Sequence, residues 1–311
     1  MDILIIFTGG TIGSEVKDGY ICVNTTGIQA FLSSTDFSSK NINIHTENPY
    51  TILSETLNGT HIARLVSFIN DNISSYDGII VTHGTDTLQY TAAALGYAFS
   101  DTDIPIILVS SNYVLNDPRA NGMDNLSYAI DYICNNGKPG IYASYRNTGH
   151  DKKLYNALCL LPHQIYDDSL YELENSKHDT LPDPGVMNRA CLKLEEHSPV
   201  LWLRAYPGMH FPSLLTDTSI STVSGSHTAG YAIYKYVLLD SYHSGTIDTS
   251  SHELKTFSAV AKQLGIGIFL IGLDSEITYE TTKSYTDLGI NILPRISPAA
   301  AYIKLWIMSY V

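Results

Sequence analysis

The chain has 311 residues, about twice the length of a typical single domain, so we expect two domains. Hydrophobic residues make up 44% of it and charged residues 16%, which is typical of a globular protein with a sizeable core. The net charge is −13 and no stretch is densely basic, which argues against nucleic acid and anionic membranes as main partners.

Cysteine spacing and the first residues indicate the compartment. The four cysteines form no CxxC pair and stand far apart, at Cys22, Cys134, Cys159 and Cys191. This spacing favours reduced thiols over a zinc site or a disulfide framework. The opening "MDILIIFTGG" is typical of a strand rather than of a signal peptide, and no apolar stretch reaches the ~20 residues that span a bilayer. We therefore expect a cytoplasmic protein.

Strand-like and helix-like segments alternate in the first half of the chain. Buried strands are predicted at 3–7, 78–82, 104–109 and 140–145, and helices at 61–69, 87–99 and 125–133. Continuous apolar strands separated by helices are typical of a parallel sheet with helices on both faces. The predicted fold class is therefore α/β, with a Rossmann-like or flavodoxin-like N-terminal domain.

The alternation stops between about Tyr166 and Pro199, where the sequence is polar and acidic and contains two prolines, as in a linker. It then resumes, with strands at 200–206, 234–242 and 265–272 and helices near 252–264 and at 298–308. We expect an N-terminal α/β domain over 1–165, a linker over 166–195, and a smaller α/β domain with a mostly parallel sheet over 196–311.

Two polar turns follow predicted strands. "TGGTIG" occupies 8–13 and "THGTDT" occupies 82–87, and in open α/β sheets ligands bind outside the carboxyl ends of the strands. Neither turn has the spacing of a phosphate-binding loop. A threonine beside two glycines can be an exposed nucleophile with N–H groups as oxyanion donors, although a plain turn also explains the first stretch.

The second turn is richer in polar groups than a helix start requires. Either Asp86 or Thr87 could cap the following helix, but one cap explains only one residue and leaves Thr85 without a role. His83 alone is more typical of a packed, hydrogen-bonded histidine than of a catalyst. No second His or Cys stands at metal-ligand spacing, so we predict no metal site.

Taken together, "TGGTIG" and "HGTDT" about 70 residues later resemble the bacterial-type asparaginase family, closest to its cytoplasmic type I branch. Other segments are similar to that family as well: "GYICV" (19–23, like its flexible lid), "NDPRANGMDNLSYAI" (116–130), "LRAYPGM" (203–209) and "SPAAAYIKLWIM" (297–308). The resemblance covers nearly the whole chain and is weakest between about 146 and 196. It implies no cofactor, a small-molecule amide substrate, and a homodimer or homotetramer.

The resemblance also implies roles for single residues. Thr11 would be the primary nucleophile that attacks the side-chain amide carbon, and Tyr20 the lid tyrosine that helps to activate it. Thr85 would be the second catalytic threonine, and Asp86 the carboxylate that holds the α-amino group of the substrate. The implied substrate-binding residues are Gly10, Ser54, Glu55, Gly84, Thr85 and Asp86, of which the Ser-Glu pair grips the α-carboxylate and α-amino groups.

One position departs from the family pattern. The family carries a lysine that helps to deprotonate the second threonine, but the matching position here is Pro162, in a segment without lysine. His163 next to it, or Lys152 or Lys153 from the preceding loop, could supply the base; the other alternative is that no base is present. A positioned base typically contributes ~10²–10⁴ in rate, so activity on asparagine could be low or redirected.

Three functions are compatible with these residues. The leading hypothesis is an amidohydrolase that converts L-asparagine to L-aspartate and ammonia through a threonyl ester. A second is the ammonia-releasing subunit of a tRNA-dependent amidotransferase, a branch with an extra N-terminal domain that we do not find here. A third is a catalytically weak relative that binds an amino acid as a sensor, which the missing lysine favours and the matched threonines disfavour.

Overall fold

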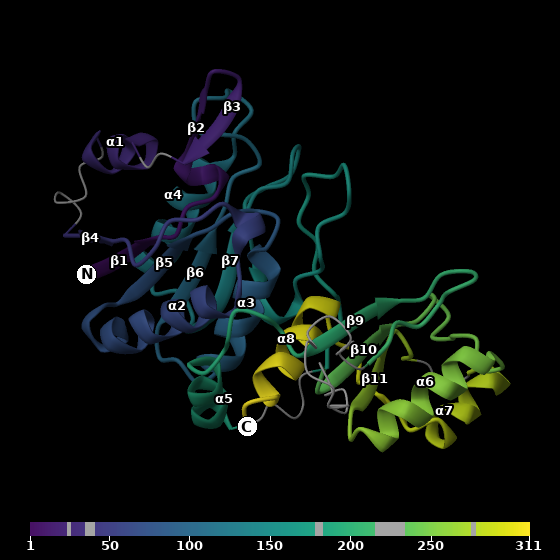
Figure 1. Cartoon of the computed structure of the whole chain (residues 1–311). Coiled ribbons are helices and arrows are strands. Elements are labelled where there is room, and N and C mark those ends of the chain that lie inside the picture. Colours follow the sequence, from purple (N-terminus) through teal and green to yellow (C-terminus); the bar gives the residue numbers. More distant parts are fainter. Residues whose placement is uncertain (24–25, 35–40, 178–182, 215–233, 275–277) are drawn as a thin grey trace, which may run out of the picture.

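The structure is a computed structural model that describes residues 1–23, 26–34, 41–177, 183–214, 234–274 and 278–311. Figure 1 shows a larger sheet built from the first half of the chain and a smaller sheet built from the second half, each covered by helices. The predicted α/β class, with two mostly parallel sheets, is confirmed. None of the helices in the described segments has the length and apolar character needed to cross a membrane.

The larger sheet has six strands in the order β4-β1-β5-β6-β7-β8, all parallel except β8, which pairs antiparallel with β7. Its strands are β1 (Asp2–Phe7), β4 (Asn43–Glu47), β5 (Gly78–Thr82), β6 (Pro105–Val109), β7 (Gly140–Tyr145) and β8 (Lys153–Asn156). Counted along the chain, the five parallel strands have the order 2-1-3-4-5 of flavodoxin-like sheets. The strand order therefore reverses between β1 and β5, where such folds bind ligands.

Helices cover both faces of this sheet because the side chains of its strands alternate in direction. Leu4 and Ile6 of β1 pack on one face against α2, α3, α5 and α8, and Ile3 and Ile5 pack on the other face against α1 and α4. These helices are α1 (Thr26–Ser34), α2 (Gly59–Asn72), α3 (Leu88–Ala98), α4 (Gly122–Cys134), α5 (Pro184–Cys191) and α8 (Pro298–Met308).

The smaller sheet has four parallel strands in the order β12-β11-β10-β9. Its elements are β9 (Val200–Arg204), β10 (Tyr236–Asp240), α6 (His252–Gln263), β11 (Gly267–Ile271), α7 (Ser284–Asp287) and β12 (Ile290–Ile292). Val237 and Leu239 of β10 pack on the face that α6 covers, whereas Leu238 between them belongs to the core of the larger sheet.

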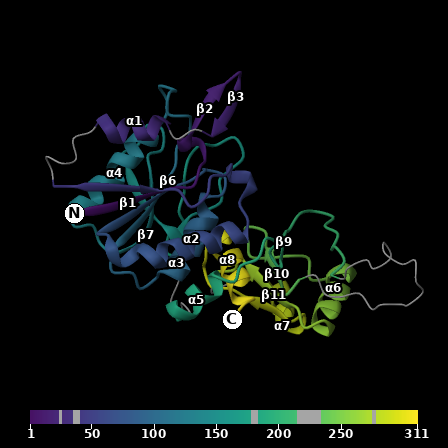
Figure 2. The same ribbon diagram turned by 60° about the vertical axis from the view of Figure 1, so that its left-hand side comes forward.

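Helix α8 connects the two sheets. Figures 1 and 2 show it between α3 and the strands of the smaller sheet. Ala300, Ala301 and Ile303 are fully or almost fully buried in the core that also contains α3, and the hydroxyl of Tyr97 in α3 donates a hydrogen bond to the carbonyl of Ala300 at 3.2 Å. One apolar core therefore extends across both sheets.

The expectation of an irregular linker was wrong at Pro184–Cys191, which forms α5. The Asp183 carboxylate accepts a hydrogen bond from the Val186 N–H at 2.9 Å, and Pro184 occupies the first turn, where its missing N–H has no consequence. Met187 and Cys191 are buried against the larger sheet. The polar composition of this stretch had suggested a linker despite the helix-start signal at Asp183 and Pro184. In the structure, the burial of these apolar side chains stabilises the helix. Residues 178–182 of the expected linker lie outside the described part of the chain.

A hairpin follows the first strand. A 3₁₀ turn, η1 (Thr11–Gly13), leads from β1 into β2 (Ser14–Lys17), which pairs antiparallel with β3 (Tyr20–Val23). The two residues between the strands, Asp18 and Gly19, have φ values of 53° and 82°, as a tight two-residue hairpin turn requires. In both ribbon views the hairpin projects away from the larger sheet.

Candidate active site

The two polar turns predicted from the sequence lie side by side at the carboxyl edge of the larger sheet. β1 and β5 are neighbours, with Phe7 paired to Thr82, and the Thr8 hydroxyl donates to the Thr82 carbonyl at 2.6 Å. Gly10 has a φ of 78°, and a Cβ atom on it would lie 2.3 Å from the backbone nitrogen of Gly84. Only glycine allows this approach. Thr11 and Thr85, which follow Gly10 and Gly84, therefore begin from backbones that are in contact.

A third segment, η3 (Ser54–Thr56), joins the two turns. A Cβ atom on Gly84 would lie 2.4 Å from the Cβ of Ser54, which places the two backbones in close contact. The Ser54 hydroxyl donates to the Asp86 carboxylate at 2.6 Å, and the Thr87 hydroxyl donates to the Ser54 carbonyl at 3.1 Å. The site therefore combines residues from three separate parts of the chain.

Capping of the next helix does not account for these polar groups. Thr87 is the N-cap residue of α3, yet its side chain caps no N–H group and bonds to Ser54 instead. The Asp86 carboxylate is exposed and accepts the bond from Ser54, while Thr85 is half-buried. The side chains of the second turn thus face another segment and a cavity, which fits a binding surface better than a helix start.

His83 has a structural role, as the sequence pattern favoured. Its ring is buried, and both nitrogens are engaged: Nδ1 with the Gly84 carbonyl and Nε2 with the Thr91 hydroxyl, each at 2.8 Å. Burial lowers its pKa to about 4, so the ring is neutral at pH 7. His83 therefore stabilises the second turn by linking it to α3.

A cavity of about 440 Å³ opens beside Thr85 and Asp86. It is lined by residues at or after strand ends, by the first turn of α3 and by one loop: Thr85, Asp86, Gln89, Tyr90, Asn112, Tyr145 and residues 162–168. Thr11 does not line this cavity, although its neighbour Gly10 contacts Gly84. The volume is within the range of small-ligand sites, and most lining groups are polar.

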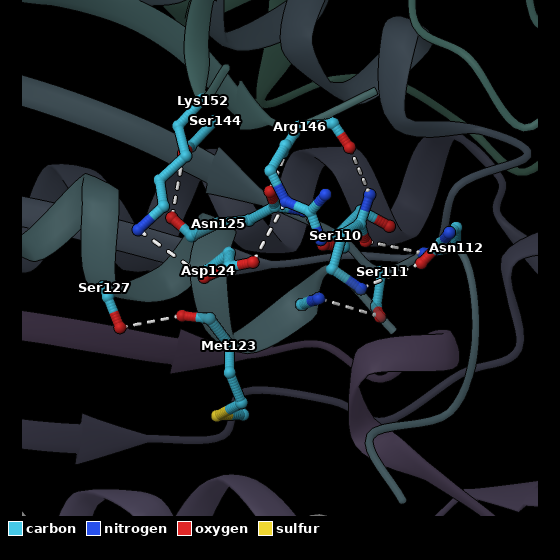
Figure 3. A network of polar contacts seen from close by, with 12 residues as sticks. Ser110, Ser111, Asn112, Met123, Asp124, Asn125, Ser127, Ser144, Arg146 and Lys152 are labelled. Carbon is cyan, nitrogen blue, oxygen red and sulfur yellow. Dashed lines mark hydrogen bonds and ion pairs between the residues drawn. The ribbon is translucent and has the colours of Figure 1, made fainter. Parts of the chain in front are cut away.

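The three candidate bases lie in different surroundings. His163 lines the cavity, as does Pro162, and its Nε2 atom is buried without a hydrogen-bond partner among the described residues. Lys153 forms an ion pair with Glu172. Lys152 lies 3.5 Å from the Asp124 carboxylate (Figure 3). Of the three, the structure brings only His163 to Thr85 and Asp86.

A polar network behind the cavity holds Asn112 (Figure 3). The backbone N–H of Asn112 donates to the Asn121 side chain, and the Asn121 N–H donates to the Asn112 side chain, both at 2.9 Å. The Asn121 amide group donates in turn to the Arg146 carbonyl at 2.8 Å, and the Arg146 N–H donates to the side chain of Asn125 at 2.8 Å. Sequence reasoning missed Asn112, whose signal was its place shortly after the apolar strand β6.

Two other candidates are more open. Tyr20 opens β3 of the hairpin, is 76% exposed, and makes no hydrogen bond to Thr11 among the described residues. Glu55 lies exposed in η3 beside Ser54. In this structure, Tyr20 therefore does not cover the first turn.

Comparison with known proteins supplies the family. Residues 2–153 match the family model described as "Asparaginase, N-terminal". This half of the chain is an asparaginase-family domain. It contains all the site segments named above except residues 162–168.

Three related proteins match a little under half of this chain. The L-asparaginase of Thermococcus kodakarensis is 29% identical over 152 residues, 47% of this chain and 44% of that protein. L-asparaginase 1 of Escherichia coli is 32% identical over 140 residues, 43% of this chain and 40% of that protein. A glutamyl-tRNA(Gln) amidotransferase subunit of Thermoplasma volcanium is 33% identical over 141 residues, 45% of this chain and 34% of that protein. The chain thus spans less than half the length of each of these relatives.

Solved structures extend the likeness in fold to the whole chain. The thermostable L-asparaginase from Thermococcus kodakarensis superposes with a TM-score of 0.73 at 19% identity, covering 100% of this chain and 93% of that one. L-asparaginase I from Vibrio cholerae gives a TM-score of 0.69 at 21% identity, covering 99% and 92%. Both sheets and the asparaginase-family domain therefore have the arrangement seen in those proteins.

Proposed function

We propose that the chain is an amidohydrolase that converts L-asparagine to L-aspartate and ammonia through a threonyl ester on Thr11. The observation that carries the proposal is the contact of Gly10 with Gly84 and of Gly84 with Ser54, which gathers the three polar segments at the switch point of the sheet. The asparaginase-family match over residues 2–153 supports the same chemistry.

The proposed reaction has two halves. In the first, the Thr11 hydroxyl oxygen bonds to the side-chain amide carbon as its proton leaves, and the C–N bond breaks with protonation of the nitrogen, which releases ammonia. In the second, water bonds to the ester carbon, the bond to Thr11 breaks, and the threonine hydroxyl is restored. The products are aspartate and ammonia, and the enzyme returns to its starting state.

The exposed carboxylate of Asp86 suits the α-ammonium group of a free amino acid. Its bond from the Ser54 hydroxyl fixes one of its oxygens, which leaves the other for the ligand. Glu55, exposed in the same 3₁₀ turn as Ser54, would take the second contact to that ammonium group. We propose Ser54 and the glycine turns for the α-carboxylate, so that the site selects a zwitterion.

The test of this function is ammonia release from asparagine, glutamine and other β-amides by the native chain and by Thr11→Ala. We expect turnover by the native chain and a loss of at least ~10³-fold in the variant, since an essential nucleophile is removed. Thr11→Ser, which keeps a hydroxyl, should retain part of the rate, and Thr256→Ala on α6 should retain all of it. Equal rates for native chain and Thr11→Ala would remove Thr11 from the mechanism.

A second candidate is the ammonia-releasing subunit of a tRNA-dependent amidotransferase. The similarity at 33% identity to the glutamyl-tRNA(Gln) amidotransferase subunit of Thermoplasma volcanium favours it. It requires the same chemistry at Thr11 but a partner that receives the ammonia. Free asparagine turned over rapidly by the isolated chain supports the first function, whereas slow turnover in the absence of a partner supports the second.

A catalytically weak amino-acid sensor is the remaining alternative. Tight aspartate or asparagine binding, measured by calorimetry, without any ammonia release would favour it. For the enzyme we further propose a cytoplasmic homodimer or homotetramer that needs no cofactor. Sedimentation at several concentrations tests the assembly, and full activity in the presence of EDTA tests the independence from metal.

A further inference from the structure

The cavity beside Thr85 is lined by a histidine whose Nε2 atom has no hydrogen-bond partner among the described residues. This histidine is His163, and its Nε2 atom is buried. A buried polar atom without a partner is uncommon and calls for an explanation, such as a role in catalysis or a bound ligand. His163 lines the same cavity as Thr85 and Asp86, which favours a role in the proposed reaction.

The other ring nitrogen determines which form the histidine takes. A backbone group of Asp167 raises the pKa of His163, as a hydrogen-bond acceptor such as a carbonyl does. Since Nε2 has no hydrogen-bond partner within the described residues, this acceptor favours the tautomer with the proton on Nδ1. In that tautomer Nε2 has a free lone pair that can accept a proton.

The charges around the ring favour a base that is neutral before the reaction and can be protonated during it. Burial is the largest effect and lowers the pKa of His163 below its usual value. Three carboxylates act in the opposite direction: Asp86 from the start of α3, and Asp167 and Asp168 from the same loop. They would stabilise the imidazolium once a proton arrives, and no Lys or Arg of the described segments lines the cavity.

We propose that His163 is the general base of this site and accepts a proton through the hydroxyl of Thr85. The inference rests on the proposed amide hydrolysis and adds to it the group that the sequence lacks at position 162, where a proline stands.

The proton path can be written for the second half of the reaction. As water bonds to the ester carbon, it gives a proton to the Thr85 oxygen, and Thr85 gives its own proton to Nε2 of His163. When the ester bond to Thr11 breaks, the proton returns along the same path to the Thr11 oxygen. His163 ends neutral, Thr85 ends as a hydroxyl, and no other reactant is needed.

The experiment compares three variants across pH 4 to 9: His163→Gln, His163→Ala and His61→Gln. His61 is the matched control because burial also lowers its pKa and its Nδ1 is also buried with no hydrogen-bond partner among the described residues, yet it packs on Tyr50, away from this cavity. We expect kcat for asparagine to fall about 10²-fold or more in both His163 variants, with KM unchanged. The native chain should show an acid limb in its pH–rate profile, below the usual pKa of histidine, and this limb should disappear in both His163 variants.

Chemical rescue adds a readout that a purely structural histidine would not move. Imidazole added to His163→Ala should restore part of kcat, with no effect on Thr11→Ala. A native rate and a native acid limb in His163→Gln, or equal losses in His61→Gln, would overturn the role of His163 alone and leave the function standing. No ammonia release by the native chain from any amide would overturn the proposed function and this inference together.

Discussion

Gly10 shows how one residue decides whether the site exists. Its φ of 78° lies in the left-handed region, and its Cα faces the backbone of Gly84 so closely that no side chain fits between them. The two requirements are independent: one concerns the conformation of Gly10 itself, and the other concerns its neighbour. Both turns need their glycine if the backbones that carry Thr11 and Thr85 are to lie in contact.

We predict that Gly10→Ala lowers the free energy of unfolding by ~2–4 kcal/mol and abolishes ligand binding, because a left-handed alanine costs ~1–2 kcal/mol and the clash with Gly84 adds to it. Gly265→Ala is the control: Gly265 has a similar φ of 71° but open space around its Cα. The control should lose only ~1–2 kcal/mol. Urea unfolding of the two variants gives the difference, and equal losses would mean that the contact with Gly84 has no energetic weight.

At the level of residues, the sequence indicated the two turns but not the cavity. Thr85 and Asp86 were found because they follow a continuous apolar strand, where ligand sites of α/β sheets lie. Asn112 and Tyr145 also lie at or shortly after the ends of strands of the same sheet, and that place was their only signal in the sequence. The place of His163 beside Thr85 and Asp86 depends on how the loop at 162–168 packs, which no spacing in the sequence indicates.

At the level of elements, the hairpin β2–β3 is the part of the site that stands apart. It has a tight turn at Asp18 and Gly19, and its residues 15–22 are exposed. Tyr20, next to that turn, is mostly exposed and does not reach Thr11. For Tyr20 to act on Thr11, the hairpin must close over the first turn when a ligand binds.

We predict that saturating aspartate slows trypsin cleavage after Lys17, in β2, by about tenfold or more, because closure removes the open hairpin from the ensemble. Cleavage after Lys262, an exposed lysine of α6, should not change. Mass spectrometry of the fragments over time separates the two sites. The same cleavage rate after Lys17 with and without aspartate would contradict closure of the hairpin.

The elements that sequence reasoning found and missed differ in their burial. The strands at 3–7, 78–82 and 104–109 are buried on both faces and carry unbroken apolar runs, which a single sequence displays clearly. The edge strands β4 and β8 are largely exposed, so their sequences lack that signal. Such edge strands form because the adjacent strand has unpaired backbone N–H and C=O groups along its outer side. This is a property of the sheet and not of the sequence of the edge strand.

At the level of the whole molecule, buried neutral histidines couple stability to pH. His83 has a pKa of about 4 in the folded chain, against about 6.5 when unfolded, because burial disfavours its charged form. Between these values the unfolded chain binds the extra proton, so stability present above about pH 6.5 is lost as the pH falls towards 4. Burial lowers the pKa of His61 and His163 in the same direction.

We predict that the free energy of unfolding falls by ~3 kcal/mol between about pH 7 and pH 4 through His83 alone. His83→Gln should be less stable than the native chain at pH 7, since the bonds to Gly84 and Thr91 are weakened, but its stability should depend less on pH. Urea unfolding at several pH values measures both slopes. A variant whose stability falls with acid as steeply as that of the native chain would rule out His83 as the source.

Helix α8 also determines when the core around α3 can be completed during synthesis of the chain. The positions that complete the packing around α3, including Ala300 and Ile303, leave the ribosome roughly 200 residues after α3 itself. Until then, the nascent first sheet displays an uncovered hydrophobic face to water or to a chaperone. Mutations in α8 should therefore reduce the yield of folded chain in cells more than their effect on the purified protein suggests.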